Sequence, residues 1–595
     1  MSNLSFYEQD PQQAIVMVDI YINEKLLEAE LLLESIWVRK ELNKIGKAEV
    51  NFKVWSSSTS EEANTNIDIL QPGNKIRIEA GYYKVGETNS IFEGIIIEQK
   101  LNLVKVGTSS IKIGCRDYLY LATLVPKTMV FNKTNDKSLL QNVASAYQGL
   151  EVKVGESNFE FPSITQHKIS DWDFLLERAA NNGFVIQLEG KKCVIEAPKV
   201  DVNPVLVLKL FDNIEELKAE VQAQNQLSIV KALAWNQKEQ KLEVSTCKSD
   251  EVKDNDQGDE SLNDLDKALG KPELIIQEST FYDQSTIKKK AEAQMLFSSL
   301  QKIKGEISCQ GTADIIHGSL VTIEDVSLAL NGNAFCGAVE HEVKSGKWKT
   351  TLCMGFEYKG IKQQEKNPKV STLQIGKVTK IDEDPQKEYN IQVEIPLFQG
   401  DEINKIWARR ATFWASNGYG SFFIPDVGDE VVVGFFDNDE SLPVILGSLY
   451  SSKQAPSEEQ KKENYIKSLV TKAKLSLTFD DEKKVITWKT PGGNSIVISD
   501  DANGIQLTDK NKNSIVMDAN GITIKSASAL NLEAKTNISI QAGTELVIKG
   551  KSAVNISGAN IEAKADVGFT AKGSASAELS AGGQTVVKGA IVMIN

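Results

Sequence analysis

Histidines are scarce in this chain of 595 residues, which limits the chemistry it could perform. The three histidines are His167, His317 and His341, and the last stands between Glu340 and Glu342. Such a triplet would suggest a metal site. In an alternating strand, however, neighbouring side chains point to opposite faces, so these three cannot converge on one ion. We therefore expect no metal site and no cofactor.

The carboxylates give no clearer sign of catalysis. Asp254, Asp256 and Asp259 occur in an acidic stretch with the spacing of a calcium loop, but the glutamate at the twelfth position and the flanking helix pair are missing. The sequence predicts a solvated, exposed loop there. Asp171 and Glu177 fall in a predicted helix, where acids in the first turns stabilise the N-terminal dipole.

The six cysteines form no CxxC pair, and several lie in apolar runs such as the one around Cys193. Buried, unreactive thiols are the simplest interpretation. No GxSxG, HExxH or phosphate-binding loop occurs either. We assign no catalytic residue and predict that the chain is not an enzyme.

Composition narrows the class of partner. The formal net charge is −14, and a strongly acidic chain without a basic face repels nucleic acid. The N-terminus has no secretory signal pattern, and no apolar run approaches the roughly 18 residues that span a bilayer. We expect synthesis and assembly in the cytoplasm. The length also exceeds what one hydrophobic core supports, so several domains are expected.

Most of the chain shows the period-two alternation of β-strands. β patterns cover residues from about 12 to 125, 205 to 360 and 372 to 450. Helical spacing occurs at 137–143, 170–180 and 284–302, and glycines at 149 and 183 end the first two helices. Residues 451–474 are rich in Lys, Glu, Gln and Ser, which indicates a linker or a loosely held helix.

The C-terminal segment carries an apolar repeat with a period of eight residues in two parallel series. The repeat positions are Ile522, Ile524, Leu530, Leu532, Ile538, Ile540, Leu546, Ile548, Val554 and Ile556. Period-two alternation inside a period of eight predicts short strands joined by tight turns and stacked along one axis. Two inward aliphatic residues per strand cannot close a core alone. We therefore predict three identical chains wound into a stiff prism, with these residues as its core.

Just upstream, residues 494–498 and 513–517 are near copies, as are 503–507 and 520–524. Each member of the second pair begins with Asn-Gly, which supplies the positive φ angles of tight turns. These copies predict a wider collar before the needle narrows.

Residues 372–450 contain a pattern of aromatic, glycine and proline residues. Its members are Trp407, Trp414, Gly418, Gly420, Phe422, Pro425, Gly428, Gly434, Pro443 and Gly447. This segment resembles the small OB-fold barrel of VgrG proteins, the spikes of type VI secretion systems, with relatives in myophage tails and extracellular contractile injection systems. Residues 170–175 with 182–183, and 317–323 with 330–332, 339–341 and 348–350, are similar to the hub motifs of the same family.

The resemblance implies a mainly β protein with a hub of β-barrel domains and small helical insertions, an OB-fold barrel and an intertwined trimeric β-helix needle, a β-prism. The implied boundaries are 1–125 for hub barrel I, 126–204 for a helical and αβ insertion, 205–365 for hub barrel II, 370–450 for the OB domain, 451–475 for a linker and 476–595 for the needle.

It also implies a function as a homotrimeric spike that rests on the inner tube and baseplate or wedge proteins, punctures a target membrane and helps deliver effectors. Contraction would carry the spike outside the cell or into a target cell, with only transient membrane contact. Met593 and Ile594, near the C-terminus, would dock a PAAR-like tip protein. A trimeric tail spike with glycan-hydrolase activity is the alternative; its site would need two carboxylates about 5–10 Å apart. The needle acids occupy no common repeat position.

Overall fold

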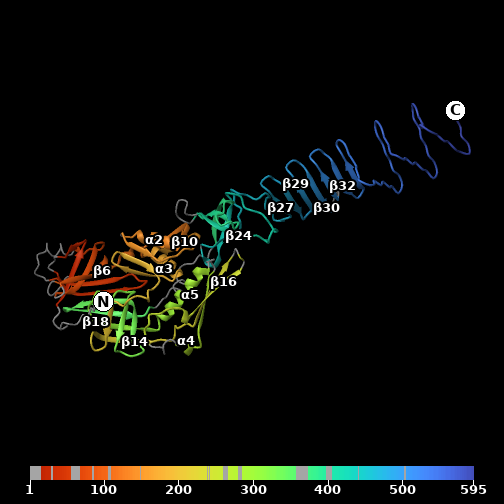
Figure 1. The fold of residues 1–595 in the computed structure, drawn as a ribbon. Helices are drawn as coiled ribbons and strands as arrows, with labels where there is room; N and C mark the ends of the chain where they lie inside the picture. Colours follow the sequence, from red (N-terminus) through yellow and green to blue (C-terminus); the bar gives the residue numbers. More distant parts are fainter. Residues whose placement is uncertain are drawn as a thin grey trace. The chain divides into compact units, whose positions relative to one another are not determined.

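The computed structural model describes residues 15–27, 31–54, 68–83, 86–102, 104, 109–147, 149–236, 239, 241–258, 265–278, 284–356, 373–396, 405–439, 441–500 and 504–594. It divides into two compact units, 1–455 and 456–595. Figure 1 shows the fold, and each unit is described by itself below.

The largest element of unit 1 is a sheet of 13 strands. Its N-terminal strands are β1 (Val16–Ile22), β2 (Lys25–Leu26), β3 (Leu32–Glu41), β4 (Lys47–Val54), β5 (Lys75–Tyr82), β6 (Glu87–Asn102) and β7 (Ser109–Arg116). The later strands are β13 (Leu206–Lys209), β14 (Ile214–Val221), β18 (Ile303–Gln310), β19 (Leu320–Glu324), β20 (Gly332–Lys344) and β21 (Lys347–Met354).

The two predicted hub segments both contribute strands to this one sheet. Strand β3 pairs antiparallel with β20, with His341 opposite Val38, so the chain's first and second hub segments form one hydrogen-bonded ladder. Two cores lie against this sheet, and Val343 and Trp348 of the second segment join the first of them. One core gathers around Ile36, Val50 and Ile78, and the other around Ile307 and Leu352.

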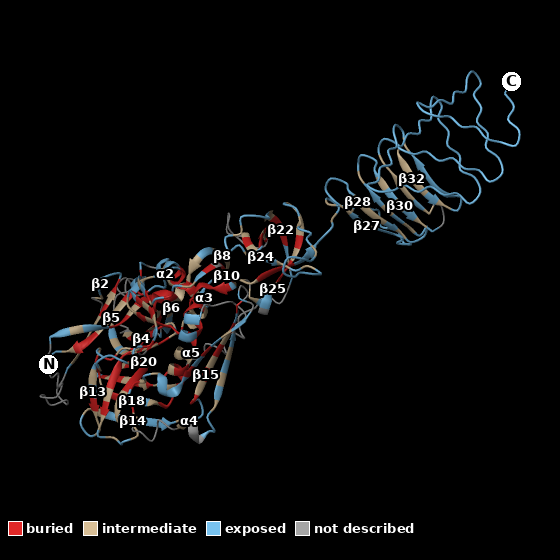
Figure 2. Cartoon of the chain, turned by 45° about the vertical axis from the view of Figure 1, so that its right-hand side comes forward, coloured by how far each residue is buried: buried red, intermediate tan, exposed pale blue. Residues whose placement is uncertain are grey.

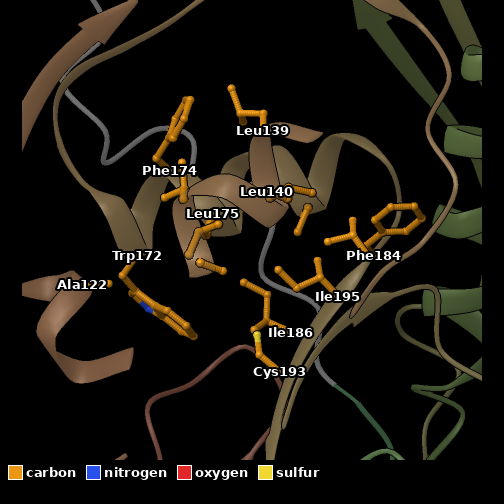
Figure 3. Close-up of a cluster of buried hydrophobic side chains, with 14 of the residues drawn as sticks. Ala122, Leu139, Leu140, Trp172, Phe174, Leu175, Phe184, Ile186, Cys193 and Ile195 are labelled. Atoms are coloured by element: carbon orange, nitrogen blue, oxygen red, sulfur yellow. The ribbon is translucent and has the colours of Figure 1, made fainter. Parts of the chain in front are cut away.

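The insertion between these segments holds two short helices on small sheets. Its elements are the 3-10 helix η2 (Tyr118–Thr123), β8 (Pro126–Asn135), α2 (Asp136–Ser145), β9 (Glu151–Val154), β10 (Glu160–Ser170), α3 (Asp171–Asn181), β11 (Val185–Glu189) and β12 (Lys192–Glu196). The helices confirm the sequence prediction, and Ser170 caps α3 by accepting from the Asp173 N–H. Figure 3 shows Leu139, Leu175 and Ile186 of its core, which the helices pack against the strands.

A second small sheet contains β15 (Ile229–Asn236), β16 (Lys241–Lys248) and β17 (Glu273–Glu278), with the predicted helix α5 (Gln284–Ser299) against it and the short helix α4 (Leu265–Ala268) nearby in sequence. The prediction of a wholly solvated acidic loop after β16 is wrong. Asp254 pairs with the buried Lys302 at 3.0 Å, and Asn255 and Gln257 are buried against β20. These contacts tie the loop down. Asp259 lies outside the described residues.

The predicted OB domain is a closed barrel of five strands in the order β22-β23-β24-β26-β25. The strands are β22 (Gln374–Lys380), β23 (Ile391–Glu394), β24 (Lys405–Arg410), β25 (Glu430–Phe435) and β26 (Pro443–Ser448). Val393, Ile406 and Val431 are among its buried residues. Val130 of β8 joins the same core, so the barrel packs against the insertion.

Unit 2 begins with a seven-stranded antiparallel sheet in which each strand pairs with the next along the chain. The strands are β27 (Ile466–Val470), β28 (Ser476–Asp480), β29 (Val485–Lys489), β30 (Ser495–Ser499), β31 (Ile505–Thr508), β32 (Ser514–Asp518) and β33 (Gly521–Lys525). We call residues 466–525 the collar. The linker predicted at 451–475 is therefore too long, because β27 lies inside it. The near copies noted in the sequence form β30 to β33 as expected.

Two general features complete the fold. No described helix is long and apolar enough to cross a membrane. All six cysteines are free thiols, five of them buried, and burial raises the pKa of Cys115 and Cys309 to about 12. These thiols are packing residues, as the sequence suggests.

Candidate trimerisation surface

The collar sheet carries two continuous rows of mainly apolar side chains on one face. The first row joins cross-strand partners Leu469, Leu477, Trp488, Ile496, Leu507, Ile515 and Ile524. The second row joins Lys467, Phe479, Ile486, Ile498, Ile505, Met517 and Ile522. The rows are two residues apart in every strand, so they share a face.

The opposite face is more polar. Between the two rows, the intervening positions are Ser468, Thr478, Thr487, Val497, Gln506, Val516 and Thr523. A sheet with one apolar face needs a covering layer on that side. The only charge in the rows is Lys467, whose ammonium group bonds the Asn464 carbonyl at 2.6 Å and pairs with Asp481.

An open groove of about 900 Å³ follows the first row. Its lining runs from Leu469 through Trp488 and Ile524 to Leu530, the next residue of the eight-residue series. The apolar surface of the collar is therefore continuous with the start of the needle repeat.

The structure places the predicted needle residues in two groups. Ile522 and Ile524 lie in β33, one in each row of the collar. The other eight lie in residues 526–594, where no described residue belongs to a strand, and their exposed fractions range from 51 to 70%. Short strands were expected there. A strand exists only when its backbone groups pair with a neighbour, and the described chain offers them none.

Unit 2 has no core of its own. Among residues 456–500 and 504–594, none is buried, and Figure 2 shows that segment in tan and pale blue only. A chain of this length that leaves its aliphatic side chains in water lacks the main favourable term of folding. This surface requires a partner.

The OB-domain residues separate into barrel and loop positions. Trp407, Gly434, Pro443 and Gly447 lie in barrel strands, and the other six lie in the segment between β24 and β25. There Gly420 has a φ of 139° and bridges Ala415, and a side chain on it would meet the Trp414 carbonyl. Trp414 and Phe422 are mostly exposed, with the Arg410 guanidinium 5.6 Å from the Phe422 ring centroid. They form an aromatic surface outside the barrel.

Met593 and Ile594, the predicted docking residues for a tip protein, are 86% and 90% exposed. No described residue covers them. They offer a small apolar patch.

The buried carboxylates of the hub accept hydrogen bonds from neighbouring residues. Asp171 accepts from Lys127 Nζ at 2.5 Å, from Gln166 Nε2 at 2.9 Å and from the Tyr147 hydroxyl; burial alone would raise its pKa, but these bonds lower it. Asp136 accepts from Arg178 Nε at 2.7 Å.

Asp117 accepts from the Gly46 N–H at 2.5 Å and the Leu119 N–H at 3.1 Å, while burial raises its pKa to about 7. Because their oxygen atoms are held by neighbouring groups, these three acids serve the packing of the hub.

His341 behaves as the alternation predicted. Its ring is buried and lies 3.0 Å from the Thr350 hydroxyl, whereas Glu340 turns the other way toward Arg39. Burial, with nearby Lys40, lowers the His341 pKa to about 3. Among the described residues, no three His, Cys, Asp or Glu side chains are placed to hold a metal ion.

Sequence reasoning missed one buried polar cluster. Lys40 on β3, Glu189 on β11 and His317 before β19 meet where three parts of the hub join. His317 Nδ1 lies 3.2 Å from a Glu189 oxygen, and His317 Nε2 accepts from the Leu188 N–H at 3.4 Å. The contact between Lys40 and Glu189 could not be predicted from the sequence, because 149 positions separate the two residues.

Curated relatives share short segments with this chain. The type VI secretion system spike protein VgrG4b of Pseudomonas aeruginosa is 46% identical over 52 residues, which is 9% of this chain and 6% of the relative. VgrG3 of Vibrio cholerae is 44% identical over 50 residues, 8% of this chain and 5% of the relative. The chain thus matches less than a tenth of the length of either relative.

Family models cover far more of the chain. One described as the Alg8 N-terminal domain matches residues 12–345, more than half of the sequence. The type VI secretion system/phage-baseplate injector OB domain matches 374–450, and the phage baseplate V C-terminal trimerisation domain matches 484–595. The chain belongs to the Alg8 N-terminal domain family, and its OB and C-terminal segments are similar to those of VgrG-type spikes and phage baseplates.

The fold of this chain resembles solved structures of low sequence identity. A chain of the Francisella PdpA–VgrG complex aligns with a TM-score of 0.51 and 12% identity, covering 83% of this chain and 88% of that one. The range matched by the trimerisation domain includes β29 to β33 and the whole eight-residue repeat.

Proposed function

We propose that this spike is the homotrimeric centre of a contractile injection machine, which connects the inner tube and baseplate to the tip and punctures a target membrane mechanically. The observation that supports this most directly is unit 2, whose described residues include none that is buried. Three copies supply the missing interior by placing the two apolar series of each chain around a common axis. In this proposal the ten needle residues are the trimer core.

A wound trimer suits mechanical work. Strands that pair between chains place the backbone hydrogen bonds in one ladder with no free edge, so that an axial load is shared by many bonds. Each hydrogen bond contributes only about 1 kcal/mol to stability, so the resistance comes from their number.

The proposed partners follow from the exposed surfaces. The hub domains rest on the inner tube and on baseplate or wedge proteins, and a PAAR-like protein caps Met593 and Ile594. Effectors travel with the tip, and contact with the target membrane is transient. The chain is made and assembled in the cytoplasm and leaves with contraction. The proposed functional segments are hub barrel I at 1–125, the insertion at 126–204, hub barrel II at 205–365, the OB domain at 370–450 and the needle at 476–595.

We further propose that the spike performs no catalytic reaction and needs no cofactor. The description of the model that matches 12–345 names a domain and states no reaction. Within that range, Asp117, Asp136, Asp171 and Glu189 are each bonded to backbone, Lys or Arg donors that hold them in the fold. Incubation with bacterial cell-wall glycans should release no reducing ends, and any release would contradict this part.

The solution mass tests the proposal first. Light scattering of the full-length chain should give three times the 65.5 kDa of one chain. A chain that stops at Ala455, the last residue of unit 1, should be monomeric or weakly associated. A monomeric full-length chain at micromolar concentration would refute the trimeric needle and the puncturing mechanism with it.

A further inference from the structure

The collar and the needle differ in where their backbone groups find partners. The seven collar strands form six consecutive pairs within the same chain, from Leu469 opposite Leu477 to Ile515 opposite Ile524. In contrast, no strand pairing occurs among described residues 526–594. The collar sheet can therefore form within one protomer, whereas the needle has to wait for other chains.

We propose that the collar is the trimerisation nucleus of the spike and sets the register in which the three needles wind. This inference rests on the proposed trimer and adds the place where assembly begins. The occupant of the collar's apolar face is the same face of two further copies. A sheet of three or more strands is independently stable once an apolar face is covered, so association is the step the collar lacks.

Three observations favour a second copy as the occupant. The groove along the first row continues without interruption to Leu530 at the start of the needle repeat. The family's trimerisation domain begins at residue 484 and so includes most of the collar. The one charge in the rows, Lys467, is engaged by Asp481 and the Asn464 carbonyl of its own chain, which leaves an uncharged face suited to an identical one.

The needle cannot define its own register. Its inward residues repeat as isoleucine, leucine or valine every eight positions, so one chain can slide by a full repeat and still place aliphatic groups against aliphatic groups. Exchanges among such residues usually cost less than about 1.5 kcal/mol each. A shift of one chain by eight residues therefore loses little packing energy apart from the contacts of one repeat at each end of the needle.

The collar rows are not interchangeable in this way. Trp488 and Phe479 are larger than the aliphatic residues beside them. A shifted chain would place an indole where a smaller side chain fits, and overpacking of this kind costs about 1–3 kcal/mol per site. The unequal residues make the collar the segment that discriminates between registers.

The test compares matched pairs of acidic substitutions in the full-length chain. The collar variant is Leu507→Asp with Ile515→Asp on the first row, and its control is Gln506→Asp on the opposite face. The needle variant is Leu532→Asp with Ile540→Asp, and its control is Asn531→Asp. Light scattering over a dilution series gives the concentration at which each trimer dissociates, and limited proteolysis reports whether residues after 525 are ordered.

We expect the collar variant to dissociate at a concentration at least about tenfold higher than the wild type, whereas the needle variant keeps a trimeric mass but is cleaved after residue 525. Because the collar variant could lose its trimer by misfolding, a second variant tests the collar directly. This variant is a chain that ends at Lys525, and it should remain trimeric. A trimeric collar variant together with a monomeric chain ending at Lys525 would overturn the inference while leaving the trimeric spike intact. A monomeric wild type would instead refute the proposed function itself.

Discussion

The ammonium nitrogen of Lys40 lies 2.7 and 2.9 Å from the two carboxylate oxygens of Glu189, which joins strand β3 to strand β11 across 149 positions of sequence. Lys40 is buried, and His317 adds a third group to the cluster. Burial opposes the charge on Glu189, but Lys40 and His317 outweigh it and lower the Glu189 pKa to about 2. The Glu189 carboxylate is therefore ionised at neutral pH, and its contact with Lys40 connects the hub sheet to the αβ insertion.

Removing one partner of this pair should destabilise the hub more than removing both. Lys40→Met leaves the Glu189 charge without its main partner, and breaking a buried ion pair in this way costs about 3–5 kcal/mol. The double variant Lys40→Met with Glu189→Leu removes both charges and should recover part of that loss. Urea unfolding of the full-length protein measures both. Equal destabilisation by the single and double variants would show that the two residues do not act as a pair.

Acid should weaken the hub through His341. Its pKa is about 3 in the fold, below the usual value near 6.5, so between these values the unfolded chain binds a proton that the folded chain does not. Stability therefore falls as the pH drops from 6.5 toward 3. Between pH 6.5 and 5 the loss should be about 1.6 kcal/mol.

The variant His341→Gln isolates this contribution. It keeps a polar group near Thr350 but cannot take up a proton, so its stability should fall less than that of the wild type between pH 7 and 5. Thermal unfolding at several pH values gives both curves. Parallel curves would mean that His341 does not carry the acid sensitivity.

The alternation of the needle predicts a sharp contrast between neighbouring residues. Leu532→Asp places one negative charge from each of the three chains in the proposed interior. The needle of this variant should therefore be cleaved by protease close to residue 532. Asn531→Asp adds the same charge on the side that faces water and should change protease resistance little. Limited proteolysis with mass spectrometry locates the cuts. Equal sensitivity of the two variants would contradict the inward assignment of the leucine series.

The exposed end of the chain predicts a tip interaction. Met593→Asp with Ile594→Asp should abolish co-purification of a co-expressed PAAR-repeat protein, because the patch is apolar and fully accessible. Val567→Asp, also exposed but remote in sequence from the end, serves as the matched control and should leave co-purification unchanged. Retention by the tip variant would rule out docking through these two residues.

Local patterns in the sequence were sufficient for the helices and for many of the strands, and the family resemblance indicated the closed OB barrel. Helix α3 starts after Ser170 and ends before Gly183 because capping chemistry is local. Partners far apart in sequence were not predictable. Arg39 and Glu340 meet across 301 positions, where β3 and β20 join the first and second hub segments in one sheet.

Composition also misled at two places. Strand β27 was hidden in a polar stretch, since Lys467 and Ser468 break up its apolar residues. The acidic loop was expected to be solvent-exposed, because nothing in its sequence indicates that Asp254 forms an ion pair with Lys302. For the candidate surface, the sequence predicted that Ile522 and Ile524 belong to the apolar face. The residues of the two rows upstream of them were identified only from the strand register.

Because no described residue of unit 2 is buried, the supply of finished spikes in the proposed trimer depends on the concentration of the chain. At equilibrium the amount of trimer varies with the cube of the free protomer concentration, so halving the free protomer lowers it roughly eightfold. A lone protomer exposes its tail to proteases and to other apolar surfaces until two more arrive. Synthesis in bursts or from clustered messages would therefore yield far more spikes than the same number of chains made slowly.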